Sequence, residues 1–268
     1  DLLRELGATD SYRDRSTWDM PSIEHHHQNR RFRDWVALIE LLRDAWLETN
    51  DVDAQRASAI ALSWFHFEYP LFKRLGFFAA ANGDLPTKTW LNWLLLEDAK
   101  WLWSIDTRRE VMRLIVQRGA SLDMEDQLQL EETILKGPGE AHYSGLTPST
   151  RQYVSDELTW IFLKKLEGAT LNLGTVAAET LFDISKRQPN LKLHKYEREE
   201  FSSWMSGTGD PDYEEDKVVD IAPREQYELI SWLKENQGGA DPFATDTWVD
   251  YCRQHPLHSI TALIALGN

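Results

Sequence analysis

The sequence predicts an all-α protein, built as an irregular array of HEAT-like helical repeats. Three observations favour this class: apolar residues recur at three- and four-residue spacing, helix-stopping residues separate these stretches at short intervals, and long alternation of β-branched residues is absent. Because no strict sequence repeat accompanies the pattern, a non-repetitive multi-helix bundle is the alternative. Twelve Trp among 268 residues predict helix-to-helix wedges, with a minority at a partner surface.

Residues 1–33 carry many charges and few periodic apolar positions, so we expect an irregular lead-in. A first helical sub-array is predicted over residues 34–137. Its first helix begins where Asp34 can act as a cap, and the apolar spacing continues to Asn50, where Asn50-Asp51 ends it. A second helix is predicted from Asp53 to Ser63.

The segment Trp64–Ala81 is the most aromatic part of the chain. Pro70 is suited to the first position of a helix, and Lys73 and Arg74 are predicted to face solvent. Asn82-Gly83-Asp84 ends this helix with residues that tolerate a left-handed backbone. We expect a buried inner helix, whose apolar side comprises Leu71, Phe72, Leu75, Phe78 and Ala79.

Three more helices of the first sub-array are predicted from the residues that begin and end helices. A short helix is predicted around residues 90–95, followed by one that Asp106 caps and Gly119 ends, and by a third over residues 123–135. Residues 138–149 are rich in Gly, Pro and Ser and predict a loop between two sub-arrays.

The second sub-array is predicted over residues 150–268. It contains an acidic, turn-rich loop at residues 207–221. Tyr227, Ile230 and Leu233 are expected to point inward from one of its helices. These helices are predicted at about 150–167, 173–188, 195–206, 223–236, 244–253 and 256–267, the last opened by Pro256.

The charge balance limits the classes of partner. With 29 Lys and Arg against 44 Asp and Glu, the formal net charge is −15, which opposes binding to phosphate backbones. Two basic groups could still bind nucleic acid or phosphate. Acidic residues interrupt both groups, so ion-paired, solvated faces are the prediction; the groups are Arg30, Arg31 and Arg33, and Arg108, Arg109 and Arg113.

One candidate site is a run of three histidines after a carboxylate. Glu24 and His25–His27 are residue types that bind zinc or iron. Consecutive side chains point in different directions, however, whereas helical metal pairs are spaced four residues apart. The favoured interpretation is a polar loop in which the histidines and Asn29 hydrogen-bond to nearby backbone.

Two other groups invite a catalytic interpretation. His66 followed by Glu68 could form a buried acid-base pair, although a buried histidine with satisfied hydrogen bonds is the favoured alternative. Cys252 lies near His255 and His258, but catalytic Cys and His partners usually come from distant segments. We therefore predict no catalytic, cofactor-binding or metal-binding residues.

The compartment is predicted from what the sequence lacks. A single cysteine cannot form an internal disulfide, and neither a membrane-length apolar run nor a signal peptide is present, so a cytoplasmic protein is expected. The chain begins at Asp1 with no Met, and we expect it to be a piece of a longer protein.

Several segments between residues 15 and 140 resemble the long helical C-terminal regions of large bacterial anti-phage defence proteins. Those proteins carry an N-terminal sirtuin-like NAD-cleaving domain or a related effector. The segments that carry the resemblance are Trp18–Glu24, Gln28–Arg30, Leu38–Ala45, Tyr69–Leu75, Leu102–Trp103, Arg108–Val111 and Leu135–Pro138.

The resemblance implies a helical part that senses the invader or drives assembly, while an effector elsewhere performs the chemistry. None of the effector's residues occurs here. We therefore predict a non-catalytic scaffold or sensor that binds a protein partner or a second copy of itself, without a cofactor. The alternative is a small metal-dependent or acid-base hydrolase using Glu24 with His25–His27, or His66 with Glu68.

Overall fold

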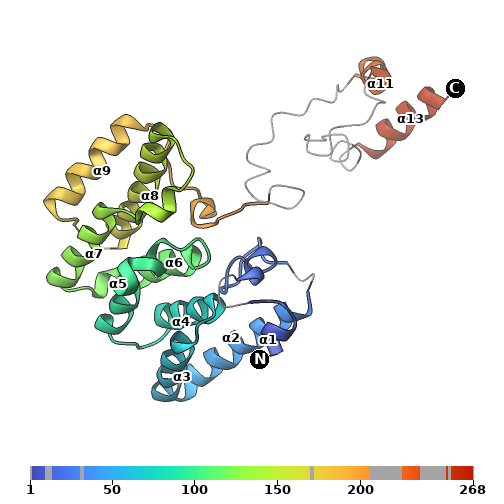
Figure 1. Ribbon diagram of the computed structural model, residues 1–268. Coiled ribbons are helices and arrows are strands. Elements are labelled where there is room, and N and C mark those ends of the chain that lie inside the picture. Colours follow the sequence, from blue (N-terminus) through green and yellow to red (C-terminus); the bar gives the residue numbers. More distant parts are fainter. Residues whose placement is uncertain are drawn as a thin grey trace. The chain divides into compact units, whose positions relative to one another are not determined.

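The computed structural model of the chain (Figure 1) describes residues 2–9, 14–30, 33–169, 172–205, 225–235, 252 and 255–267. Its contacts form two compact units, Asp1–Trp204 and Met205–Asn268. Among the described residues every regular element is a helix and no strand occurs, which confirms the predicted all-α class. No helix in this described part is both long and apolar enough to cross a membrane.

The first unit consists of nine α-helices and four 3₁₀ helices within the described residues. In chain order they are α1 (Leu2–Glu5), η1 (Arg15–Trp18), α2 (Asp34–Val52), α3 (Ala54–His66), α4 (Pro70–Asn82), α5 (Thr87–Trp103), α6 (Arg108–Arg118), η2 (Gly119–Ser121), α7 (Met124–Lys136), η3 (Glu140–Tyr143), α8 (Pro148–Ala169), α9 (Thr175–Arg187) and η4 (Arg198–Glu200).

The helices of this unit form two rows. In one row α4 packs against α6 and α6 against α8, and in the other α5 packs against α7 and α7 against α9. Contacts between successive helices, such as α3 with α4 and α5 with α6, join the rows into the stack seen in Figure 1. Helices on both sides of the predicted 138–149 loop therefore belong to the same compact unit.

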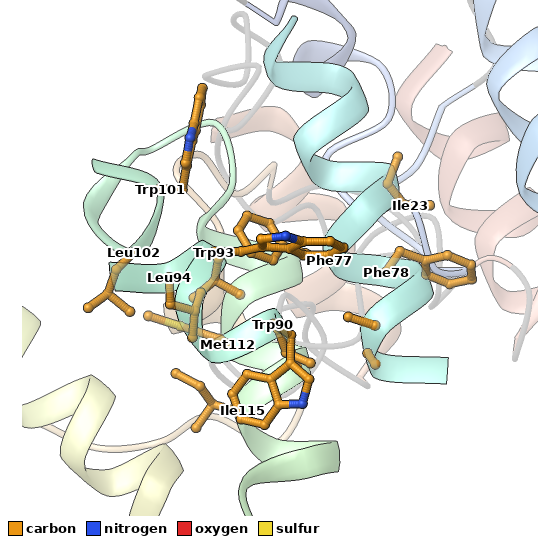
Figure 2. Packing of buried hydrophobic residues seen from close by; sticks show 14 of the residues in the cluster. Ile23, Phe77, Phe78, Trp90, Trp93, Leu94, Trp101, Leu102, Met112 and Ile115 are labelled. Atoms are coloured by element: carbon orange, nitrogen blue, oxygen red, sulfur yellow. The ribbon is translucent and has the colours of Figure 1, made fainter. Parts of the chain in front are cut away.

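The core is centred on α4, as the aromatic segment predicts. Its residues Leu71, Leu75 and Phe77 are fully buried, and both α3 and α6 pack against the helix. Figure 2 shows Phe77 beside Trp93 of α5, with the two ring centroids 6.2 Å apart. The predicted inner helix is confirmed, although Phe72 is only partly buried.

Some helices begin at the residues predicted from the sequence, and two helices do not. Pro70 occupies the first turn of α4 as predicted, and the Asp123 side chain caps α7 by accepting from the Asp126 backbone N–H at 2.8 Å. Asp34 is inside α2 and caps nothing, because Arg33 is the residue before the helix. Thr107, not Asp106, precedes α6.

The end of α4 corrects the predicted role of Gly83. The helix stops there, but Gly83 has an extended backbone with φ of −123° rather than a left-handed one. Glycine is required for space: a Cβ atom at this position would lie 3.0 Å from the Trp46 ring and 3.1 Å from the Ala79 carbonyl oxygen. The close approach of α2 to the end of α4 therefore selects this glycine.

A break in one helix follows the sequence-based prediction, and one later segment differs from it. Helix α5 is broken after Leu95, where the predicted short helix around residues 90–95 ends, because Leu96 is extended and Glu97, Asp98 and Ala99 have left-handed backbones. The predicted helix over residues 195–206 is wrong: residues 195–205 contain only η4. A continuous helix is interrupted at Glu197, whose backbone is left-handed with φ of +61°. The side chain of Glu197 forms ion pairs with Arg109 and Arg113 of α6, which hold the segment in this conformation.

The second unit has two described helices, α11 (Gln226–Glu235) and α13 (Pro256–Gly267). They pack through Leu229 and Ala262, both fully buried. The prediction that Tyr227 points inward is wrong, since 80% of its surface is exposed; Leu229 takes the inward position. The predicted acidic loop 207–221 lies outside the described residues, as does the predicted helix 244–253 apart from Cys252.

Candidate functional site

The centre of the first unit contains a buried arginine that the sequence places in solvent. Arg74 has no exposed surface, and its Nη1 donates to Asp14 Oδ2 at 2.9 Å while its Nε and Nη2 donate to the two carboxylate oxygens of Glu110, each at 3.1 Å. Its Nη2 also donates to the Met20 carbonyl at 2.7 Å. Burial opposes the charge, but Glu110 and Asp14 outweigh it and hold the pKa of Arg74 above its ordinary value.

Lys73 is likewise buried, which corrects its predicted place in solvent. Its ammonium group donates to the Phe65 carbonyl and lies 4.4 Å from the centroid of the Phe65 ring and 5.4 Å from that of Trp101. Burial lowers the pKa of Lys73. The aromatic side chains around α4 thus accommodate a cation as well as the apolar core.

A second group of ion pairs connects α6 to the 194–204 segment. Arg109 Nη1 lies 2.7 Å from Glu197 Oε2 and also pairs with Glu200, while Arg113 Nη1 lies 2.6 Å from Glu197 Oε1. From α8, Lys165 approaches Glu200 at 2.5 Å. Burial disfavours the Glu197 carboxylate, but Arg109 and Arg113 outweigh this and lower its pKa. The predicted solvated faces are wrong for Arg109, which is buried, whereas the predicted ion pairing is confirmed.

The histidine run lies against this same segment. His26 packs on Phe201 with ring centroids 4.6 Å apart and on His27 at 4.2 Å, and its edge faces Trp204. Burial, followed by the charge of Arg109, lowers the pKa of His26 to about 4. The imidazole is therefore neutral at physiological pH and acts as an aromatic packing group.

The neighbours of the histidine run are held by other contacts. Glu24 Oε2 accepts from Arg113 Nε at 3.1 Å. Asn29 donates to the Ser22 and Glu24 carbonyls at 2.9 and 3.1 Å, which confirms the predicted polar loop for this residue. Within the described part of the chain, no three His, Cys, Asp or Glu side chains are grouped to hold a metal ion.

The two other candidate catalytic groups, His66 with Glu68 and Cys252 with His255 and His258, do not form buried pairs among the described residues. His66 and Glu68 are both exposed, so the predicted burial of His66 is wrong; its Nδ1 lies 2.7 Å from the Leu62 carbonyl one helical turn earlier. Cys252 is half-buried, and His255 and His258 are exposed.

Two sizeable hollows lie between helices in the described part of the first unit. The larger, of about 710 Å³, lies between the break in α5, the end of α7 and the start of α8, and Asp98, Lys136 and Arg151 are among its lining residues. The smaller, of about 350 Å³, lies between α8, the start of α6 and residues 190–201. Neither hollow can be recognised in the sequence, because each is lined by residues far apart in the chain.

The second unit exposes a row of large aliphatic side chains on α13. Leu257, Ile260, Leu263 and Ile264 have between 47% and 81% of their surface exposed. At 100° per residue they occupy one sector of about 120°. The side of α13 that packs on α11 instead carries the small residues Ser259 and Ala262. The helix therefore buries its small side chains and exposes its large ones.

Comparisons with known proteins identify one relative of unassigned activity. An uncharacterised protein, y4cA, of Sinorhizobium fredii (strain NBRC 101917 / NGR234) is 24% identical over 268 residues. The alignment covers 97% of this chain and 22% of that protein, so the chain spans about a fifth of the relative's length. No family model matches the chain, and no solved structure matches it.

Proposed function

We propose that this chain is a non-catalytic helical scaffold that binds another protein chain through α13. The observation that carries the proposal is the exposed aliphatic row Leu257, Ile260, Leu263 and Ile264. Contiguous apolar surface of this kind is characteristic of protein interaction sites, because its burial releases water and contributes about 25 cal/mol per Å². A second copy of the chain is the partner to test first, since a self-complementary helix face is the common basis of two-fold dimers.

The HEAT-like repeat array is part of this proposal. Rows in which each helix packs against the next but one, joined by contacts between successive helices, are typical of helical solenoids. In such an array the helices position interaction surfaces, and the ion pairs of Arg74 and Arg109 fix the connecting segments. This arrangement supports a structural rather than a catalytic role for the buried charges.

A place in bacterial anti-phage defence completes the proposal. It rests on the resemblance of segments within residues 15–140 to the helical regions of such proteins. The alignment with a much longer bacterial protein is compatible with a multi-part polypeptide in which any effector lies outside the region that this chain matches. The cytoplasm is the compartment in which such a sensor would meet its target.

The test is light scattering of the purified chain over a concentration series reaching well above micromolar. The wild type should form a dimer or larger species, and Ile260→Glu with Ile264→Glu should remain monomeric because two charges cannot be buried unpaired. The control pair is Leu41→Glu with Val52→Glu, which are 65% and 87% exposed on α2. A monomeric wild type that also captures no partner in a pull-down, or a variant that associates equally well, would refute the proposal.

A further inference from the structure

The smaller of these two hollows is lined by three cations that form no direct ion pair with the described residues. Its volume is about 350 Å³, and Arg108, Lys192 and Arg198 line it. Among the described residues, these three side chains form no hydrogen bond or direct ion pair, although the charge of Glu157 acts on Arg108. In a chain of net charge −15, three cations left together in one cavity are an unusual arrangement.

Arg108 differs from its neighbours on α6. Arg109 and Arg113 lie four residues apart on one side of the helix and pair with Glu197. Arg108 precedes Arg109 by one residue, so its side chain leaves the helix about 100° away and faces the hollow instead. It is half-buried, and burial lowers its pKa, with Glu157 offsetting part of the effect. A partly desolvated charge without a direct ion pair costs stability, which suggests a ligand that supplies a closer anion.

The acidic residues of the hollow do not neutralise these cations. The Glu199 carboxylate is already 2.7 Å from Lys165 Nζ and accepts from the His194 backbone N–H at 3.0 Å. Glu157 is the remaining carboxylate of the lining. Three cations therefore face one uncommitted acid, and the hollow has an excess of positive charge.

The rest of the lining defines the size and character of the ligand. Apolar and aromatic side chains contribute about half of the lining residues, and Asn190 adds an amide. The volume is at the lower end of the range for small-molecule sites, so a nucleotide-sized molecule or a smaller one fits and a polymer does not. The apolar part of the wall comprises Tyr153, Val154, Leu158, Trp160, Ile161, Leu191 and Phe201.

We propose that this hollow binds a small phosphate-bearing ligand, with Arg108 and Arg198 holding the phosphate and Lys192 adding charge at the rim. Guanidinium groups suit phosphate because their planar donors form paired hydrogen bonds with its oxygens. The apolar wall would take the organic part. This site is separate from α13, and the proposal does not rest on the scaffold function.

Titration calorimetry at low salt tests it with inorganic phosphate, ribose 5-phosphate and AMP, and with ribose and adenosine as the matched molecules without phosphate. Binding of a phosphate-bearing probe to the wild type is expected, with at least a tenfold loss in Arg108→Gln and no change in Arg56→Gln, an exposed arginine of α3. Binding of inorganic phosphate alone identifies a free anion as the ligand, and tighter binding of the organic phosphates identifies a metabolite. Absence of binding by all three at millimolar concentration, or equal binding by Arg108→Gln, would overturn the proposal.

Thermal unfolding without ligand provides a second test that does not depend on the choice of probe. Because Arg108 forms no direct ion pair and its burial outweighs the charge of Glu157, Arg108→Gln should leave the melting temperature unchanged or raise it. A purely structural arginine would lower it on substitution. A fall of several degrees relative to Arg56→Gln would contradict the assignment of Arg108 to a ligand site.

Discussion

Arg74 of α4 and Glu110 of α6 form a two-pronged ion pair inside the protein, although 36 residues separate them in the sequence. Glu110 Oε1 also accepts the Ile23 backbone N–H at 2.8 Å. The pair thereby connects the N-terminal segment to the row of helices α4, α6 and α8. Buried charges of this kind are costly unless every one is paired, so the network should respond as a unit to the loss of one member.

Replacement of Arg74 by Met should destabilise the protein by about 3 to 5 kcal/mol, because Asp14 and Glu110 would be left buried without their cation. Urea denaturation measures the change in free energy of unfolding. Arg56→Met on the surface of α3 is the control and should change it by less than about 0.5 kcal/mol. Equal stabilities of the two variants would show that the network is not buried as described.

Substitution of Gly83 by Ala should cost about 1 to 3 kcal/mol, since the new methyl group would lie 3.0 Å from the Trp46 ring and 3.1 Å from two oxygen atoms. Gly139→Ala is the matched control, because no atom lies within 4 Å of the position its Cβ would take. Thermal unfolding of both variants compares them. A Gly83 variant as stable as the Gly139 variant would disagree with the close approach of α2 to α4.

Truncation of two aromatic residues of α4 should have unequal effects. Phe78 is 5% exposed, and Phe78→Ala should lower the free energy of unfolding by about 3 to 5 kcal/mol. Phe72 is only partly buried, so Phe72→Ala should lower it by less. Chemical denaturation of the two variants gives the comparison. A larger loss for Phe72 would place it, rather than Phe78, in the core.

His26 should make stability depend on pH in a defined window. Its pKa is about 4 in the folded protein against 6.5 for the unfolded chain, so between these values the unfolded chain binds a proton that the folded protein does not. The contribution of His26 to the free energy of unfolding is therefore constant above about pH 6.5 and decreases as the pH falls toward 4. Because His26 is partly exposed, the loss is discounted to about 1 to 2 kcal/mol.

His26→Gln removes this titration and serves as the comparison. The difference in unfolding free energy between wild type and variant, measured at intervals from pH 8 to pH 4, should shift in favour of the variant as the pH falls. A difference that is constant with pH would show that the His26 imidazole is solvated.

The helices were predictable where the signal is local. Pro70 begins α4 and Asp123 caps α7, because a fixed backbone angle or a cap acts within a few residues. The buried state of Arg74 was not predictable in this way, since Asp14 lies 60 residues away and Glu110 lies 36 away. A pattern of apolar and charged residues treats every arginine as solvent-facing unless its partners are close in sequence.

The roles of the basic residues on α6 also could not be predicted from the sequence. Arg108, Arg109 and Arg113 form one basic group in the sequence, but the helix directs the first to an unneutralised hollow and the other two to carboxylates of the 194–204 segment. The sequence-based prediction places a helix over residues 195–206, which include most of that segment. Its conformation is instead set by tertiary ion pairs, which override local propensity.

Hydrogen exchange of the peptide covering Pro256–Gly267 tests most directly the proposal that α13 is an interaction surface. In the wild type, exchange in this peptide should slow as the protein concentration rises from below micromolar to well above it, while α2 remains unchanged. The variant Ile260→Glu with Ile264→Glu should show no such slowing. Association of the wild type without protection of Pro256–Gly267 would contradict the account, because the partner would then bind elsewhere.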